Sequence, residues 1–265
     1  MAKQELLGER LNRETIERLC NKGWIIERAK FIYKRKINII ADVEVPIGEK
    51  QYRVVVKNFG WRNSPSRWFS PFMRSRARKS WDASWLLLEN GVKVPAPITC
   101  YTERKKGFIK KNFLLYERID DYRLARKVLR DFTTSDSFKN RMIQVIAETI
   151  FKIHRLKYLH NDLTLGNFLV KNGNPEDMYL IDLNRMAPRR FMTTFRKMYD
   201  ISKMNLCDCG LTKPHENCRW IEFLNYYEPS QVKQNMKALQ KAIQKNLLRH
   251  KVKSLKKEFL RDESD

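Results

Sequence analysis

Apolar residues change their spacing along the chain, and the change separates a sheet-forming part from a helical part. In residues 4–20 they recur among charges at helical spacing, which predicts an N-terminal helix within residues 1–22. Residues 24–33, 37–45 and 51–59 are short runs rich in β-branched and aromatic residues, with turn-forming sequences between them. This second pattern predicts three strands that form a meander.

The remainder of the chain is predicted to be mainly helical. A helix is expected to end at Asn90, because Gly91 follows it and two prolines stand just beyond. One more strand is expected over residues 112–119, followed by a long helix near residues 136–157. Two short runs, NFLVKN and MYLIDL, read as strands before helices resume to the C-terminus.

These elements predict an α+β protein with two lobes. A β-rich lobe is expected over residues 23–119, and a helical lobe over residues 120–265. The C-terminal helix, from Val232 to Leu260, carries one apolar stripe and one stripe of lysines. Such a helix usually packs its apolar side on the core and leaves its cationic side in water.

The charge of the chain narrows the range of partners. There are 54 Lys and Arg residues against 30 Asp and Glu residues, a formal net charge of +24, while the hydrophobic content of 42% is that of a folded protein. This excess predicts a polyanionic partner, such as an anionic lipid surface, a phosphorylated substrate or nucleic acid. The first twenty residues contain no signal-peptide core and no window is apolar enough to span a bilayer, so we expect a cytoplasmic protein.

The strongest chemical signal is the run HNDLTLGN at residues 160–167, which fits the pattern H-x-D-x-x-x-x-N of a kinase catalytic loop. Asp182 ends an apolar run farther along the chain, and Lys57 closes the apolar run of the third predicted strand. A lone Asp or Asn at the end of a strand is more often a turn or capping residue. Three such residues in kinase order and spacing, together with Lys57 in the third predicted strand, instead favour a nucleotide site and a protein-kinase-like fold of two lobes.

Phosphoryl transfer asks the protein mainly for positioning and for neutralisation of charge. Asp162 is predicted to orient the attacking hydroxyl and to accept its proton. Asn167 and Asp182 are predicted to hold Mg²⁺ on the phosphates of ATP, and Lys57 is predicted to bind the α- and β-phosphates. ATP and Mg²⁺ are therefore the expected cofactors.

Further runs make the assignment more specific. They are SRARKSWD at residues 75–82, then LLLENGVKVPAPI, HNDLTLGN, IDLNR, and GLT ahead of IEFLNYY. Together they resemble the bacterial lipopolysaccharide core kinases, the Kdo and heptose kinases, over roughly residues 30–228. The form Asp-Leu-Asn-Arg is the most discriminating piece, because most protein kinases have Asp-Phe-Gly there. The resemblance implies an ATP-dependent sugar kinase, peripheral on the inner face of the inner membrane, with lipopolysaccharide core glycolipid as its substrate.

The turn between the first two predicted strands departs from glycine-loop kinases. It reads Lys34-Arg35-Lys36, so the phosphates of the nucleotide are expected to meet the cations of Lys34 and Lys36. The alternative is a solvated hairpin tip.

Other contacts with the nucleotide are less well defined by the sequence. Asp82 is the expected helix acid that pairs with Lys57, although some relatives place the acid two positions earlier, at Ser80. An exposed helix carboxylate is the alternative for Asp82. Glu117 and Ile119 lie where adenine would meet the backbone that joins the lobes.

Asp200 lies on a predicted helix at the position where kinases bury an Asp that braces the backbone of the catalytic loop. The alternative is a surface residue of that helix.

Four potential zinc ligands lie within twelve residues, in the pattern C-x-C-x₅-H-x₂-C: Cys207, Cys209, His215 and Cys218. The spacing matches no common zinc finger, and the resemblance implies an ordinary helix-loop-helix here. We therefore expect reduced thiols on a loop that folds without metal.

Residues 61–78 interleave aromatic side chains with arginines, among them Arg62 and Arg67. This mixture suits a membrane interface or an anionic glycolipid, and the alternative is a loop that packs its aromatics on the β-rich lobe.

The sequence thus predicts an ATP- and Mg²⁺-dependent kinase that phosphorylates Kdo or heptose in the lipopolysaccharide inner core. One alternative is an atypical small protein kinase associated with nucleic acid or ribosomes, against which Asp-Leu-Asn-Arg argues. Another is an inactive kinase-like module that only binds polyanions, against which the joint presence of Lys57, Asp162, Asn167 and Asp182 argues.

Overall fold

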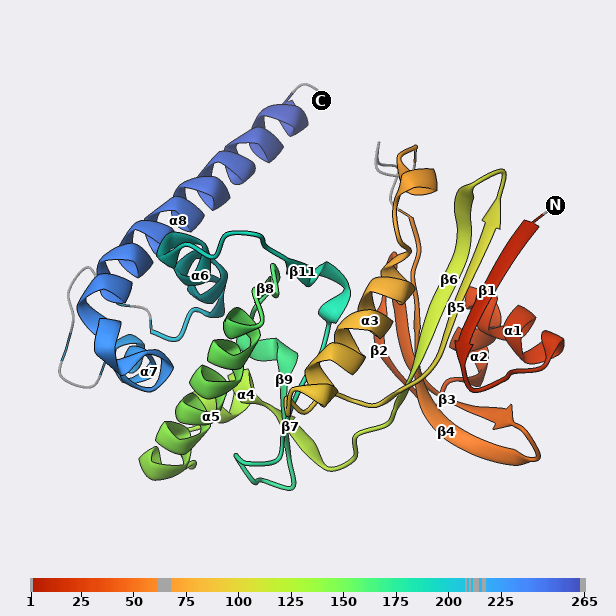
Figure 1. Ribbon diagram of the computed structural model, residues 1–265, viewed down its shortest axis with the longest axis horizontal. Coiled ribbons are helices and arrows are strands. Elements are labelled where there is room, and N and C mark those ends of the chain that lie inside the picture. The colour runs from red at the N-terminus through yellow and green to blue at the C-terminus, as the bar shows by residue number, and fades with distance from the viewer. Residues whose placement is uncertain are drawn as a thin grey trace. The chain divides into compact units, whose positions relative to one another are not determined.

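The computed structural model describes residues 2–61, 68–207, 209, 211, 215 and 218–262. The chain divides into two units, shown in Figure 1. The first comprises Met1–Tyr122 and Tyr179–Met186, and the second comprises Arg123–Met178 and Ala187–Asp265. The predicted lobe boundary between residues 119 and 120 lies close to the observed one, but the prediction missed that Tyr179–Met186 belongs to the first unit.

A six-stranded antiparallel sheet forms the first unit, with strand order β1-β5-β6-β4-β3-β2. In chain order the strands are β1 (Ala2–Gly8), β2 (Phe31–Arg35), β3 (Ile39–Ile47), β4 (Lys50–Asn58), β5 (Pro97–Lys105) and β6 (Phe108–Glu117). The sequence predicted β3, β4 and β6, whereas β1 and β5 were missed.

Helices cover both faces of this sheet. Ile25 of α2 (Lys22–Arg28) packs with Tyr101 and Leu115, as does Leu19 of α1 (Arg13–Cys20). On the other face, Ala77 of α3 (Arg76–Glu89) packs with Cys100 and Leu114. These two residues directly precede Tyr101 and Leu115 in the sequence. Successive residues of a strand point to opposite faces, so α1 and α2 lie on one face and α3 on the other (Figure 1).

The predicted N-terminal helix over residues 1–22 is wrong at its start, where β1 pairs with β5 along its whole length. Leu6 packs into the core beneath α1 and α2, while Leu7 packs into the core beneath α3. A strand lets both neighbours be buried, one on each face. The helix begins only at Arg13, after Asn12, whose side chain accepts a hydrogen bond from the backbone of Thr15.

The first predicted strand, residues 24–33, is also partly wrong. Its first half belongs to α2, whose N-terminus is capped by the side chain of Asn21, which accepts hydrogen bonds from the N–H groups of Gly23 and Trp24. Only the second half forms β2. A cap of this kind favours a helix over a strand for the residues that follow it.

The second unit is mainly helical, as predicted. Its helices are α4 (Ala125–Arg130), α5 (Asp136–Arg155), α6 (Thr194–Ile201), α7 (Arg219–Tyr227) and α8 (Val232–Asp262). A small sheet has the order β10-β9-β7, in which β7 and β10 stand where the chain passes from one unit to the other, and β8 pairs with β11. These strands are β7 (Tyr122–Leu124), β8 (Tyr158–Leu159), β9 (Phe168–Lys171), β10 (Met178–Leu180) and β11 (Ala187–Pro188).

Helix α5 packs its apolar side on α7, and α8 packs on α6. Leu239 and Ala242 of α8 are fully buried, whereas Leu247 in the middle of the helix is exposed. Within the described residues, no helix has an apolar stretch long enough to cross a lipid bilayer.

Candidate active site

Lys57 lies near the end of β4, on the face of the sheet that α3 covers. Its partner in the β-ladder is Leu114, which belongs to the core beneath α3. Only 3% of the residue is exposed, and its Nζ donates a hydrogen bond to Oδ1 of Asp182 at 2.6 Å. The structure therefore brings together two predicted site residues that are 125 positions apart in the sequence.

Burial lowers the pKa of Lys57, and the carboxylate of Asp182 opposes this shift. The cations of Lys34 and Arg76 lower the pKa of Lys57 further. Lys34 is exposed on β2, and its role as a phosphate contact stays a prediction. The site around Lys57 is thus rich in positive charge, which suits phosphate groups.

Asp182 follows β10 and has a left-handed backbone conformation, with φ of 65°. It precedes the short 3₁₀ helix η4 (Leu183–Arg185), which packs on α3. The side-chain amide of Asn184 donates a hydrogen bond to Oδ1 of Asp182, and the N–H of Leu180 donates to the carbonyl of Lys93 at 2.9 Å. These contacts fix the carboxylate beside Lys57.

The predicted ion pair between Asp82 and Lys57 is not present, because Lys57 pairs with Asp182. Asp82 accepts hydrogen bonds from Arg78 at 2.7 Å and from Arg74 at 2.8 Å. The alternative position, Ser80, is fully buried, and its hydroxyl donates to the carbonyl of Arg76 at 3.0 Å. An arginine one helical turn before Asp82 captures its carboxylate, because side chains four residues apart lie side by side on a helix.

Two residues near this site were not singled out from the sequence. Arg76 begins α3, donates hydrogen bonds to the carbonyl of Gly60 and to Oδ1 of Asn38, and lies over the rings of Phe59 and Trp61. Asn184 holds Asp182, as described above. The form Asp-Leu-Asn-Arg could have pointed to Asn184, whereas nothing in the sequence separates Arg76 from the other arginines around it.

The remaining residues predicted to contact the nucleotide lie at or just beyond strand ends of the first unit. Lys36 is exposed just after β2, and its N–H donates to the carbonyl of Asn38 at 3.3 Å in the hairpin turn. Glu117 ends β6, and its N–H donates to the carbonyl of Ala96 at 2.8 Å. Ile119 is buried, with 5% exposure.

The predicted catalytic loop in the second unit is held by Asp200 of α6. Its two carboxylate oxygens accept hydrogen bonds from the backbone N–H groups of His160, at 2.7 Å, and Asn161, at 2.8 Å. Lys203 donates to the carbonyl of Asn161 at 2.8 Å, and Asn161 has a left-handed backbone with φ of 64°. The prediction that Asp200 braces this loop is confirmed.

Asp200 is buried, as a brace of this kind must be. Burial alone would raise its pKa, but the facing His154 ring and the charge of Lys203 outweigh burial and lower the pKa of Asp200. Burial also lowers the pKa of His154, whose Nδ1 lies 2.7 Å from the hydroxyl of Tyr227. Asp200 is therefore charged while it accepts the backbone hydrogen bonds of the loop.

Asp162 and Asn167 are fixed relative to each other in the same loop. The side-chain amide of Asn167 donates to the backbone carbonyl of Asp162 at 2.8 Å. Leu163 and Leu165 are buried between them, and Leu165–Asn167 forms the 3₁₀ helix η3. Because Asn167 uses its amide nitrogen for the loop, its side-chain oxygen remains the atom that can bind a cation.

The cysteine cluster lies on the loop between α6 and α7. The structure brings the donor atoms of Cys207, Cys209, His215 and Cys218 within 4.8 Å of one another. In the Arg-rich stretch, residues 62–67, with Arg62 and Arg67, lie outside the described residues.

Comparison with known proteins gives matches of three kinds. The lipopolysaccharide kinase (Kdo/WaaP) family matches residues 50–227. A 3-deoxy-D-manno-octulosonic acid kinase of Vibrio vulnificus strain CMCP6 is 30% identical over 122 residues, which are 46% of this chain and 49% of that protein. The corresponding kinase of Vibrio cholerae is 28% identical over 127 residues, 48% of this chain and 51% of that protein. The chain thus spans about half the length of these curated relatives.

A solved structure, described as WaaP in complex with acyl carrier protein, resembles this fold. The two superpose with a TM-score of 0.59 at 17% identity, over 90% of this chain and 99% of the other. The kinase-like α+β fold predicted from the sequence is therefore confirmed. The family match covers most of the chain, from β4 to the end of α7, and so includes Lys57, the HNDLTLGN loop and Asp182. On this match the chain belongs to the lipopolysaccharide kinase (Kdo/WaaP) family.

Proposed function

We propose that this protein is an ATP-dependent kinase that transfers phosphate to a hydroxyl of Kdo or heptose in the lipopolysaccharide inner core. The observation that carries the proposal is the ion pair between buried Lys57 and the partly exposed Asp182, at 2.6 Å, in a member of this family. A lysine and a metal-binding Asp are the two charged groups that kinases hold on the nucleotide phosphates. The curated relatives, named as Kdo kinases, support a sugar as the acceptor.

The nucleotide would be bound by residues of the first unit. Lys57 would bind the α- and β-phosphates, and Lys34 and Lys36 would approach the β- and γ-phosphates from the hairpin. Adenine would meet the backbone at Glu117 and Ile119, where the N–H of Glu117 already donates to the carbonyl of Ala96. Asp82, which pairs with arginines, has no assigned contact with ATP.

The residues predicted for Mg²⁺ have suitable chemistry. Magnesium prefers oxygen ligands, and Asp182 offers a carboxylate. Asn167 offers its side-chain oxygen, because its nitrogen is engaged with the carbonyl of Asp162. When bound, Mg²⁺ would neutralise the negative charge that develops on the phosphates during transfer.

Asp162 would accept the proton of the sugar hydroxyl. The backbone of its loop is held by Asp200 through two hydrogen bonds and by Lys203 through a third. These hydrogen bonds fix the backbone of the loop, and a fixed backbone helps to keep a catalytic base within hydrogen-bonding distance of the acceptor hydroxyl. The order of the motifs and the geometry within each unit support these roles.

A glycolipid acceptor would require contact with an anionic membrane surface. Arg104 of β5 donates to the carbonyls of Ser70 and Met73 and so fixes the short 3₁₀ helix η2 (Ser70–Phe72). Next to these anchors Trp68 and Phe72 are 76% and 90% exposed, which suits insertion among lipid headgroups. We therefore propose a peripheral protein on the inner face of the inner membrane.

Incubation with labelled ATP and Mg²⁺ tests the activity, with core glycolipid, a basic protein and tRNA as possible acceptors. We expect label on the glycolipid, and we expect Asp162→Asn to lower its transfer at least about 100-fold while ATP binding persists. Asp136→Asn, which changes an Asp in the first turn of α5, is the matched control. Because the control carboxylate lies outside the proposed site, the control variant should retain activity.

Other labelling patterns would overturn the proposal. Label on the basic protein alone would indicate the atypical protein kinase. ATP binding without transfer to any acceptor would indicate a polyanion-binding module. An acyl carrier protein accompanies WaaP in the solved structure, so such a protein belongs in the binding assay as a further possible partner.

A further inference from the structure

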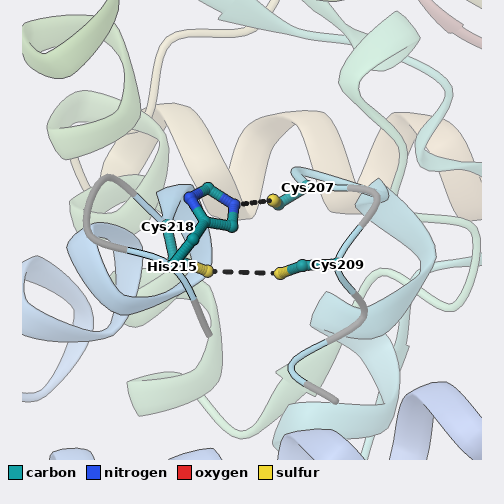
Figure 2. Close-up of side chains that lie close together, drawn as sticks. All are labelled: Cys207, Cys209, His215 and Cys218. Atoms are coloured by element: carbon teal, nitrogen blue, oxygen red, sulfur yellow. Dashed lines mark hydrogen bonds between the residues drawn. The ribbon is translucent and has the colours of Figure 1, made fainter. Parts of the chain in front are cut away.

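Four side chains with metal-binding chemistry meet on the loop between the 3₁₀ helix η5 (Ser202–Met204) and α7, as Figure 2 shows. They are Cys207, Cys209, His215 and Cys218. The Sγ of Cys207 lies 3.1 Å from Nε2 of His215, and the Sγ of Cys209 lies 3.4 Å from the Sγ of Cys218. All four donor atoms lie within 4.8 Å of one another.

We propose that these residues form a structural zinc site with three cysteine ligands and one histidine ligand. Zinc binds thiolate sulfur at about 2.3 Å and imidazole nitrogen at about 2.0–2.1 Å in a tetrahedron, so neighbouring ligands are separated by about 3.5–3.8 Å. The separations of 3.1 Å and 3.4 Å fall just below this spacing, and the upper limit of 4.8 Å lies above it. Small side-chain rotations therefore bring all four atoms to the distances that zinc requires.

Backbone hydrogen bonds of the loop hold the ligands Cys209, His215 and Cys218. The N–H of Leu211 points to the Sγ of Cys209 at 3.5 Å, an interaction that stabilises a thiolate. The N–H of Cys218 donates to the carbonyl of His215 at 3.1 Å. Cys218 directly precedes α7, and its carbonyl accepts from Ile221 in the first turn of that helix at 2.9 Å. Cys218 is thus fixed at the start of α7.

The charge balance also favours the metal. Three thiolates and one zinc ion carry a net charge of −1 in a chain whose formal charge is +24. Each cysteine gives its proton to solvent as its bond to zinc forms, and no atom changes oxidation state. With four protein ligands the coordination shell is closed, so the site is structural and leaves no position for a substrate.

A disulfide between Cys209 and Cys218 is the competing arrangement. Their sulfurs are 3.4 Å apart, whereas a disulfide bond measures about 2.05 Å. A disulfide would use two of the four residues and would give no reason for the contact between Cys207 and His215. The zinc site accounts for all four, and it replaces the expectation of a loop that folds without metal.

Elemental analysis of the full chain, purified in reducing buffer without added metal, tests the site. We expect about one zinc per chain, and less than about a tenth of that in Cys209→Ser and Cys218→Ser. Cys20→Ser, which changes a half-buried thiol in α1 of the first unit, is the matched control and should keep its zinc. Wild-type protein treated with a chelator should melt at lower temperature, and zinc should restore the original Tm.

Cobalt provides a readout that does not depend on the variants folding. Co²⁺ added to metal-free wild-type protein should give the absorption bands of a tetrahedral cobalt–thiolate site, and zinc should abolish them. Absence of zinc together with failure to take up cobalt would overturn the proposal. So would mass-spectrometric detection of a Cys209–Cys218 disulfide in the freshly purified, metal-free protein.

Discussion

A buried lysine needs a nearby anion, and Asp182 is the anion beside Lys57 in this protein. Removing one partner of a buried ion pair leaves the other charge uncompensated, which costs several kcal/mol. Asp182 therefore has two roles in the proposal, since it also offers a carboxylate to the metal. The carboxylate of Asp82 has neither role, because Arg74 and Arg78 already hold it.

This difference predicts unequal effects of two similar substitutions. Asp182→Asn should lower the rate of phosphoryl transfer at least about 100-fold and raise the Mg²⁺ concentration needed for activity. Asp82→Asn should raise the KM for ATP by less than about fivefold, because a partly exposed ion pair contributes about 1 kcal/mol or less. Steady-state kinetics at several Mg²⁺ concentrations would measure both. A larger rise for Asp82→Asn would mean that Asp82 turns to Lys57 when ATP binds.

Residue types and their order were enough to predict Lys57 and Asp182 as site residues. The acid that pairs with Lys57 could not be predicted in the same way. Arg78 stands one turn before Asp82, and only the path of α3 decides whether an acid on this helix faces the sheet or the arginine. The role of Arg76 was missed for a similar reason, because its contacts come from Phe59, Gly60 and Asn38, which are distant in sequence.

At the scale of elements, the sequence predicted those segments whose pattern is decided locally. Strands β3, β4 and β6 and helices α3, α5 and α8 follow from periodicity and from stop signals such as Gly91. Strand β1 was predicted as a helix because Leu6 and Leu7 stand among charges at helical spacing. Its strand form depends on pairing with β5, about one hundred residues away in the sequence, and periodicity does not reveal such a distant partner.

The end of β1 provides a test of this packing. Gly8 has φ of +81°, and a Cβ there would overlap the carbonyl oxygen of Ile98 and the ring of Trp81. Gly8→Ala should therefore combine backbone strain of about 1–2 kcal/mol with a steric clash. Gly48→Ala is the matched control, since Gly48 has φ of +62° with open space around its Cβ position.

Calorimetric melting of both variants should give a fall in Tm for Gly8→Ala at least about twice that for Gly48→Ala, because strain alone acts at the control position. Equal falls would mean that β1 can move away from β5 at little cost in stability.

For the molecule as a whole, the net charge of +24 and the exposed aromatics near η2 predict binding to anionic vesicles. Binding should weaken between about 0.05 and 0.5 M salt, since screening shortens the range of surface charge. Phe72→Ser should weaken binding further by removing an apolar group that enters the interface. Phe132→Ser is the control, because Phe132 is fully exposed but belongs to the second unit and not to residues 61–78.

Sedimentation with vesicles of neutral and of anionic lipid would measure these effects. Equal binding to both kinds of vesicle at low salt would exclude electrostatic attachment. An equal loss for the two Phe variants would exclude η2 as the specific contact.

The short return of the chain to the first unit, at Tyr179–Met186, limits how this protein can be divided. A fragment that stops at Tyr122 would contain all six strands of the large sheet but would lack Asp182. Lys57 would then be a buried cation without its carboxylate, and α3 would lose the contact with η4. Neither unit is one continuous piece of sequence, so gene truncation at a single point cannot yield an intact half. A gene fusion that exchanged the helical unit would have to keep the eight residues Tyr179–Met186 with the sheet.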